Sequence, residues 1–96
     1  MDERQYCVYI MTNKASTVLY TGFSGNLPER VMQHKSKVVE SFTKRYSVNR
    51  LVYYEVTDDV DGAMERERQI KAGSRKKKMD LIDAFNPTWR DLSAEL

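Results

Sequence analysis

YCVYIMTNKASTVLYTGFSGNLPERVMQH, residues 6–34, is the stretch that decides the fold. It contains two apolar runs that carry tyrosines, residues 7–10 and 18–20, separated by the polar residues 12–17. Each run has the alternation of period two that is typical of a strand, and a short polar connector indicates a hairpin. The chain is therefore expected to begin with two antiparallel strands.

A helix is predicted directly after this hairpin. Gly22 and Gly25 are expected to break the second strand, since glycine weakens strands. Asn26 followed three residues later by Glu29 has the spacing of a capping box, which places the start of a helix at Leu27.

Four polar side chains converge on the hairpin and this helix. In the first strand, the period of two puts Tyr9 on the same face as Cys7. Tyr20 lies in the second strand, and Arg30 and His34 share one face of the helix because they are four residues apart. Two tyrosines, an arginine and a histidine are thus expected to lie near one another and to line one concave, solvent-reachable surface.

The remainder of the chain predicts one more strand and two more helices. Residues 50–56 are rich in strand-forming side chains. Asp61 is expected to cap a helix from Gly62 to about Ala72, and Ser74 a further helix that ends before Asn86-Pro87. Trp89 and Leu92 are expected to fold the C-terminal tail back over the core. The 96 residues then form a single α/β (α+β) domain, residues 1–96, in which a three-stranded antiparallel sheet is flanked by helices in the order β-β-α-β-α-α.

Composition limits the class of protein. No apolar run approaches the roughly 20 residues of a membrane helix, and the N-terminus lacks the pattern of a signal peptide. The single cysteine, Cys7, excludes an internal disulfide and favours a cytoplasmic location. A net charge of +2 is modest, but the basic residues are clustered, and clustered basic residues attract phosphate backbones. The alternative for the basic run at residues 75–78 is a solvated helix face.

The position of Glu67 is informative even without any comparison to a family. Ala63, Glu67 and Ile70 have the spacing of one helix face, so Glu67 falls on an apolar stripe, whereas Glu65 is expected at the surface beside Arg68. A carboxylate on a core-facing stripe must be paired, protonated or bound to a metal. A salt bridge to a neighbouring basic residue is the alternative to a metal ligand.

The stretch resembles the GIY-YIG nuclease domain, in which tripeptides on two neighbouring strands carry tyrosines and the next helix carries an arginine. Here the tripeptides are Cys7-Val8-Tyr9 and Tyr20-Thr21-Gly22, so both tyrosines and the second glycine are kept. The resemblance covers roughly residues 5–92 and is greatest to small stand-alone members described only as candidate endonucleases. The residues that carry it further are Arg30, His34, Glu67 and Asn86-Pro87.

This resemblance implies an endonuclease that hydrolyses phosphodiester bonds of nucleic acid, DNA rather than RNA, with one Mg²⁺ or Mn²⁺ held by Glu67. It implies that Tyr9 handles the proton of the nucleophile, that Tyr20 orients water or phosphate, and that Arg30 grips the scissile phosphate. A phenol with a pKa of about 10 is a poor base at neutral pH, so Tyr9 would need a nearby cation. Lys14, Lys71 and His34 are the candidates for that cation.

The resemblance also sets expectations about partners. Specificity would lie in DNA shape, such as branches or flaps, or would come from a protein partner or a second copy of the chain, and the setting would be DNA repair or recombination. The rival hypotheses are a catalytically inactive nucleic-acid-binding module on the same fold and a structural interaction domain. Asn86 has a local alternative as a helix stop. The candidate nucleic-acid contacts are Lys14, Lys35, Lys44, Arg45, Lys71, Arg75, Lys76, Lys77 and Asn86.

Overall fold

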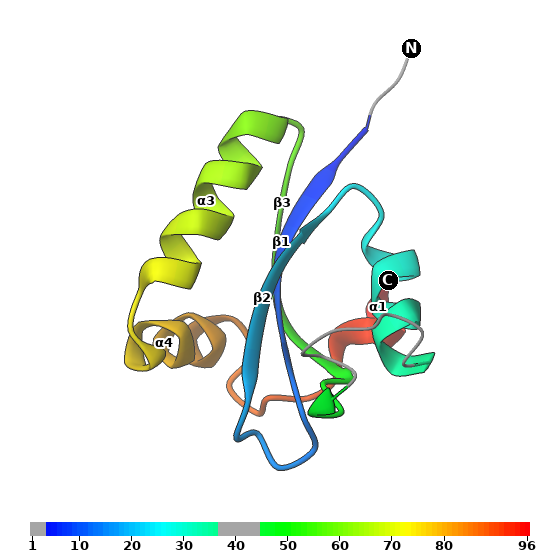
Figure 1. The fold of residues 1–96 in the computed structure, drawn as a ribbon, viewed down its shortest axis with the longest axis vertical. Helices are drawn as coiled ribbons and strands as arrows, with labels where there is room; N and C mark the ends of the chain where they lie inside the picture. The colour runs from blue at the N-terminus through cyan, green and yellow to red at the C-terminus, as the bar shows by residue number, and fades with distance from the viewer. Residues whose placement is uncertain (1–3, 37–44) are drawn as a thin grey trace.

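A three-stranded antiparallel sheet forms the centre of the molecule (Figure 1). The structure is a computed structural model that describes residues 4–36 and 45–96. Strand β1 (Tyr6–Thr12) is central, with β2 (Leu19–Ser24) on one side and β3 (Arg50–Thr57) on the other. The predicted hairpin and the predicted third strand are therefore confirmed.

Helices cover both faces of this sheet. Figure 1 shows α1 (Leu27–Ser36) and the short 3-10 helix η1 (Leu92–Glu95) on one side, and α3 (Val60–Ala72) and α4 (Arg75–Phe85) on the other. The element order and the α+β class are those predicted. Within the described part of the chain, no helix combines the length and the apolar character that crossing a membrane requires.

Alternation along β1 divides the core into two clusters. Cys7, Tyr9 and Met11 pack toward α1, whereas Val8 and Ile10 pack toward α3 and α4. Both sets are almost completely buried. Because each face of the central strand is covered by a different pair of helices, the predicted alternation sets which helix each side chain meets. It places Tyr9 on the α1 side.

Two helix starts follow their predicted caps. The Asn26 side chain accepts a hydrogen bond from the Glu29 backbone N–H at 3.2 Å, and the Ser74 hydroxyl accepts one from the Lys77 N–H, also at 3.2 Å. These bonds satisfy backbone donors that have no partner within the first turn of a helix. Helix α1 therefore begins at the predicted residue, and Arg30 and His34 keep their predicted spacing.

The start of α3 differs from the prediction. The N-cap is Asp59 and the helix begins at Val60, rather than after a cap at Asp61. The Asp59 N–H donates to the Thr57 hydroxyl at 3.1 Å, so the chain turns out of β3 earlier than its charge pattern suggests. Asp61 instead lies in the first turn, where a carboxylate favours the helix dipole.

The C-terminal tail packs across the α1 side of the sheet. Leu92 is 3% exposed, and the Asp91 carboxylate accepts hydrogen bonds from the Leu51 and Ser93 backbone N–H groups and from Lys35 Nζ. Burial alone would raise the pKa of Asp91, but these donors hold it at about 2. Trp89 packs against the other core cluster, so the predicted return of the tail over the core is confirmed.

Candidate active site

Three rings gather between the sheet and α1. Ring centroids of Tyr9 and Tyr20 are 6.4 Å apart, those of Tyr9 and His34 are 6.0 Å apart, and the edge-on contact of Tyr20 with His34 measures 5.5 Å. Tyr9 comes from β1, Tyr20 from β2 and His34 from the last turn of α1. The hairpin and the following helix thus bring together residues separated by up to 25 positions in the chain.

Tyr9 and His34 form a buried pair. The Tyr9 hydroxyl lies 3.2 Å from His34 Nε2, and the two residues are 1% and 2% exposed. Tyr20 and Arg30 are only half-buried. The expectation that all the site residues line one solvent-reachable surface is therefore wrong for Tyr9 and His34, because packing of α1 against the sheet covers them.

Burial and neighbouring charges shift the pKa values of Tyr9 and His34. Burial, and next the neighbouring Tyr20, raise the pKa of Tyr9, while the positive charge of Arg30 lowers it and the negative charge of Glu67 raises it. Burial and the Arg30 charge lower the pKa of His34. Burial and the Arg30 charge thus favour the neutral form of His34, so Arg30 rather than His34 is the positive charge beside Tyr9.

Arg30 and Glu67 approach from different elements. Arg30 lines a hollow of about 380 Å³ with Asn26, Glu29 and Gln33, whereas Glu67 lines another, of about 370 Å³, between α3 and Phe23 of β2. Their charges nevertheless both act on Tyr9. The structure thus brings the predicted residues into electrostatic contact around Tyr9 but distributes the exposed ones over two hollows.

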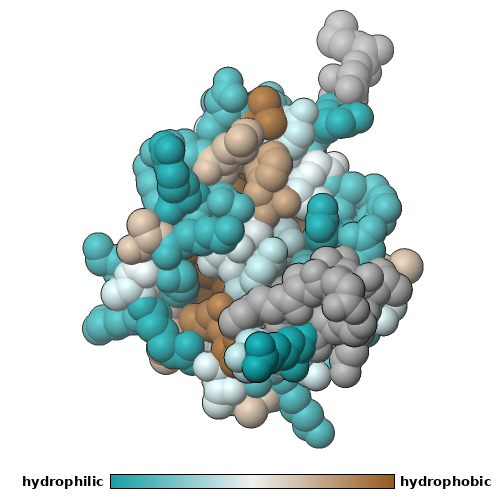
Figure 2. All heavy atoms as spheres, in the orientation of Figure 1, coloured by the Kyte–Doolittle hydropathy of each residue, from teal (hydrophilic) through white to brown (hydrophobic). Residues whose placement is uncertain are grey.

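The surface beside Glu67 is partly apolar. In Figure 2, apolar atoms gather near the upper part of α3, where Phe23 and Met64 line the Glu67 hollow. The Glu67 side chain is 24% exposed, and Lys71 Nζ lies 3.7 Å from its carboxylate. The alternative of a salt bridge to a neighbouring basic residue is therefore present in the structure, as the pair with Lys71, although this pair is open to solvent. Glu65 and Arg68 form the predicted surface pair.

Glu67 fits a metal ligand of a particular kind. Among residues 4–36 and 45–96, no group of three or more His, Cys, Asp or Glu side chains could hold a metal ion. A cation at Glu67 would take one carboxylate from the protein and its other ligands from water and phosphate, which suits Mg²⁺. The exposed carboxylate and the open hollow beside it leave room for such ligands.

The predicted nucleic-acid contacts separate into groups. Lys35 and Lys76 form ion pairs with Asp91 and Asp80, and Lys71 faces Glu67. Arg75 donates to the Ser16 carbonyl of the β1–β2 connector, which also carries the exposed Lys14. Arg45 lies over the Tyr46 ring, at 5.6 Å, and Lys44 is outside the described residues.

Asn86 belongs to the fold. It is 3% exposed, and its amide donates to the carbonyls of Val52 and Arg90 while its oxygen accepts from the Arg90 N–H. All of these bonds tie the end of α4 to β3 and to the tail. The structure thus supports the local structural alternative for Asn86, whose side chain is buried and bonded within the fold.

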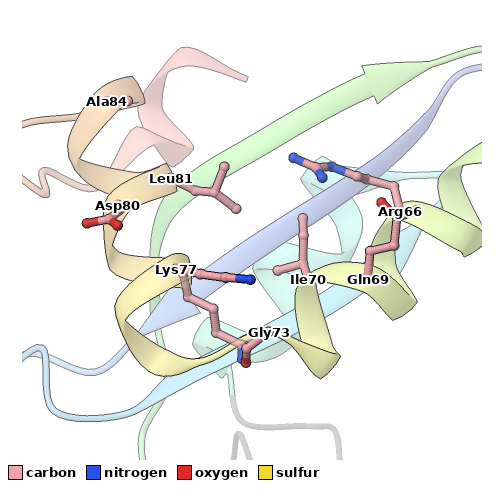
Figure 3. A pocket seen from close by; sticks show the side chains of 9 residues that line it. Arg66, Gln69, Ile70, Gly73, Lys77, Asp80, Leu81 and Ala84 are labelled. Atoms are coloured by element: carbon pink, nitrogen blue, oxygen red, sulfur yellow. The ribbon is translucent and has the colours of Figure 1, made fainter.

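Lys77 lines a hollow between α3 and α4, which is separate from the hollow lined by Glu67. Figure 3 shows this hollow of about 370 Å³ between α3 and α4, with Ile70 and Leu81 directed into it from the two helices and Lys77 reaching between them. None of the predicted catalytic residues lines it. Lys77 is thus separated from the tyrosine cluster by α3 and the sheet.

A second polar network was missed at the sequence level. Arg66 donates to both carboxylate oxygens of Glu55, at 2.9–3.1 Å, and the Tyr53 hydroxyl also bonds to Glu55. Burial and this bond raise the pKa of Tyr53 to about 12. The pair of Arg66 with Glu55 depends on how α3 packs against β3, which local patterns do not reveal. The network joins α3 to β3.

His34 predicts a specific pH dependence of stability. Because its folded pKa lies below the unfolded value of about 6.5, the unfolded state binds more protons at mildly acidic pH. The free energy of unfolding should then fall as pH decreases below about 7 and stay constant just above it. Denaturation measured from pH 8 to 5 tests this cleanly, since His34 is the only histidine in the chain. His34→Gln should remove the slope; an unchanged slope would assign it to other groups.

Gly22 corrects the predicted end of β2 and supplies another test. It lies within β2, opposite Tyr9, and a Cβ atom there would be 2.5 Å from the Tyr9 ring and hydroxyl. Gly22→Ala should displace Tyr9 and destabilise the protein by about 1–3 kcal/mol, measured by chemical denaturation. Gly25→Ala is the control, because its Cβ would make ordinary contacts at 3.6 Å with Tyr6. Equal stabilities of the two variants would contradict tight packing of Tyr9 on Gly22.

Comparison with known proteins gives consistent results. Residues 5–80 match the model of the GIY-YIG catalytic domain. A UPF0213 protein of Syntrophus aciditrophicus is 40% identical over 78% of this chain and 86% of its own length, and one of Staphylococcus saprophyticus is 35% identical over 81% and 94%. The solution structure of a UPF0213 protein of Bacillus halodurans is similar with a TM-score of 0.54 and 29% identity, over 83% of this chain and 84% of that one.

Proposed function

Because this chain belongs to the GIY-YIG family, whose catalytic domain is of the nuclease type, we propose that it is a divalent-metal-dependent endonuclease that hydrolyses phosphodiester bonds of nucleic acid, with DNA favoured over RNA. The observation that carries the proposal is the environment of Tyr9. Its hydroxyl lies against His34, and the charges of Arg30 and Glu67 both act on it. Tyr9 would therefore link three residues of the proposed mechanism: Arg30, which would bind phosphate, Glu67, which would bind the metal, and His34, which would accept a proton.

Arg30 and Tyr20 would hold the substrate in this mechanism. Arg30 is half-buried at an open hollow, so its guanidinium can grip the scissile phosphate with two hydrogen bonds and keep its charge at any working pH. Tyr20 is the more exposed of the two tyrosines and would orient the attacking water against that phosphate. These two side chains set the geometry of attack.

Tyr9 and His34 would carry the proton. Burial keeps the Tyr9 phenol protonated, so it cannot act as a free phenolate. Access of the attacking water to the Tyr9 hydroxyl, which α1 covers here, would let Tyr9 accept a proton from that water while passing its own to neutral His34 Nε2, 3.2 Å away. The two transfers leave Tyr9 neutral throughout and place the positive charge on His34. This relay replaces the cation-assisted phenolate expected from the sequence.

Glu67 would hold the Mg²⁺ or Mn²⁺ through its carboxylate. When bound, the cation would neutralise charge on the phosphate and stabilise the leaving oxygen. The chain's own contribution is to present one carboxylate at an open hollow, with Lys71 as the residue it must partly release.

The second candidate function is a nucleic-acid-binding module that does not cleave. The burial of Tyr9 and His34 favours it, since such a pair also satisfies a structural role. Incubating the pure protein with branched, nicked, flapped, single-stranded and duplex DNA, and with RNA counterparts, decides between the two. We expect cleavage of DNA with Mg²⁺ or Mn²⁺ and none with EDTA. If the protein binds nucleic acid but cleaves it under none of these conditions, the hypothesis of a binding module is retained and that of a nuclease is rejected.

Either candidate function predicts binding that weakens with salt. Each phosphate contact contributes a slope of about −0.9 in a plot of log affinity against log salt for duplex DNA. The double reversal Lys76→Glu with Lys77→Glu should reduce the magnitude of that slope by roughly two and weaken binding without changing sequence preference. The matched control is Lys76→Arg with Lys77→Arg, which keeps both charges. An identical slope in the reversal variant would make this run a solvated helix face.

A further inference from the structure

The hollow beside Glu67 has a composition that phosphate or metal binding alone does not require. Its walls are Phe23 from β2 and Met64 from α3, and its rim carries Glu65, Glu67, Arg68 and Lys71. Met64 is 55% exposed and lies one turn before Glu67 on α3, and the half-buried Phe23 of β2 lines the same hollow as both. The volume of about 370 Å³ is within the range of small-ligand sites.

Phe23 is held in a fixed orientation. Its ring stacks on that of Tyr6, with centroids 5.9 Å apart and an angle of 8° between the planes. Tyr6 and Phe23 lie on neighbouring strands and on the α3 side of the sheet, where both pack against the core. A rigid aromatic ring of this kind provides a platform on which a flat ligand can stack at little cost in conformational entropy.

The charged side chains around the platform are paired. Arg68 and Lys71 are 74% and 55% exposed and form ion pairs with Glu65 and Glu67, which line the same hollow. The apolar wall matches a nucleobase, because bases stack on aromatic side chains with little dependence on sequence. A cation held by Glu67 in this hollow would release Lys71 and bind the phosphate of the stacked nucleotide.

We propose that this hollow binds an unpaired nucleobase adjacent to the scissile phosphate, stacked against Phe23 and Met64. In an intact duplex each base is already stacked and paired, so occupation would require it to leave the helix at a cost of a few kcal/mol. At a flap, a branch or a single-stranded end that cost is small. The hollow therefore selects nucleic acids that offer an unpaired base, which defines the substrate class of the proposed nuclease and rests on that function.

A coupling measurement tests this proposal without requiring cleavage. Fluorescence anisotropy would give the affinity of the wild-type protein, in EDTA, for a DNA flap and for the same flap with abasic residues at its unpaired positions next to the junction. We expect the intact flap to bind roughly 5- to 150-fold more tightly. Phe23→Leu should remove most of this difference and leave the abasic flap unaffected.

Variants of exposed methionines make the test independent of folding. Met64→Ser changes a side chain that is 55% exposed and should reduce the same difference, whereas Met79→Ser on α4, 37% exposed, should not. The proposal is overturned if intact and abasic flaps bind equally, or if Phe23→Leu weakens both to the same extent. It is also overturned if a full duplex shows the same dependence on Phe23.

The same experiment separates this inference from the proposed function. Cleavage of the flap in Mg²⁺ or Mn²⁺ by the wild-type protein, with no difference between intact and abasic flaps, would retain the nuclease and reject the base site. A clear base-dependent affinity that requires Phe23, together with no cleavage, would retain the base site on a module that only binds.

Discussion

Glu67→Gln is expected to reduce metal-dependent cleavage by roughly 100-fold or more while leaving the protein folded. The amide keeps the size of the side chain but removes the charge that would hold the cation. The ion pair with Lys71 spans 3.7 Å and is open to solvent, so its loss should cost at most about 1 kcal/mol. Affinity for DNA without metal should stay the same or rise, because a carboxylate repels phosphate. Cleavage rates, melting temperatures and binding curves measure the three effects.

Glu65→Gln is the matched control for this variant. It lies on the same helix, lines the same hollow and forms its own exposed ion pair, with Arg68. It should change cleavage and stability little. A Glu67→Gln protein that cuts at the wild-type rate would refute the assignment of Glu67 as the metal ligand.

Tyr9→Phe is expected to lower cleavage by roughly 100- to 10,000-fold, since it deletes the hydroxyl of the proposed relay and keeps the ring. It should also cost about 1–3 kcal/mol of stability, because His34 loses its buried hydrogen-bond partner. Tyr53→Phe controls for the second effect. That residue is also buried and bonded to a polar side chain, Glu55, but lies outside the cluster. It should lose stability and keep its activity.

His34→Gln extends the same test. Glutamine can accept the Tyr9 hydrogen bond but cannot take its proton, so the relay predicts a large loss of activity with a smaller loss of stability. Retention of near wild-type cleavage by Tyr9→Phe would give the buried pair a structural role only, and the water would then lose its proton elsewhere.

The elements of this fold could be predicted because their signals are local. Alternation along β1 placed Tyr9 on the correct face, and the caps at Asn26 and Ser74 act within one turn of their helices. Gly22 shows the limit of such signals. Glycine is usually a strand breaker, but here its missing side chain accommodates the ring of Tyr9 on the neighbouring strand. Only the register of the two strands reveals that relation.

Burial at the site could not be predicted for a similar reason. Glu67 was expected on a core-facing stripe, yet it is partly exposed because it flanks the edge strand β2, where its helix face extends past the core. Tyr9 and His34 were expected at the surface, yet α1 packs directly over them. Helical spacing shows which side chains share a face, but not how much of that face its partner covers.

The contacts of Asp91 show that the cooperatively folded unit extends into the C-terminal tail. The family match stops at residue 80, but Ile82 and Leu92 are almost fully buried in the two core clusters. Asp91 binds Lys35 at the end of α1 and Leu51 in β3, so the tail holds together the helix that carries Arg30 and His34 and the sheet beneath it. The folded unit is therefore longer than the segment that matches the family model, because residues after position 80 complete both core clusters and hold α1 against the sheet.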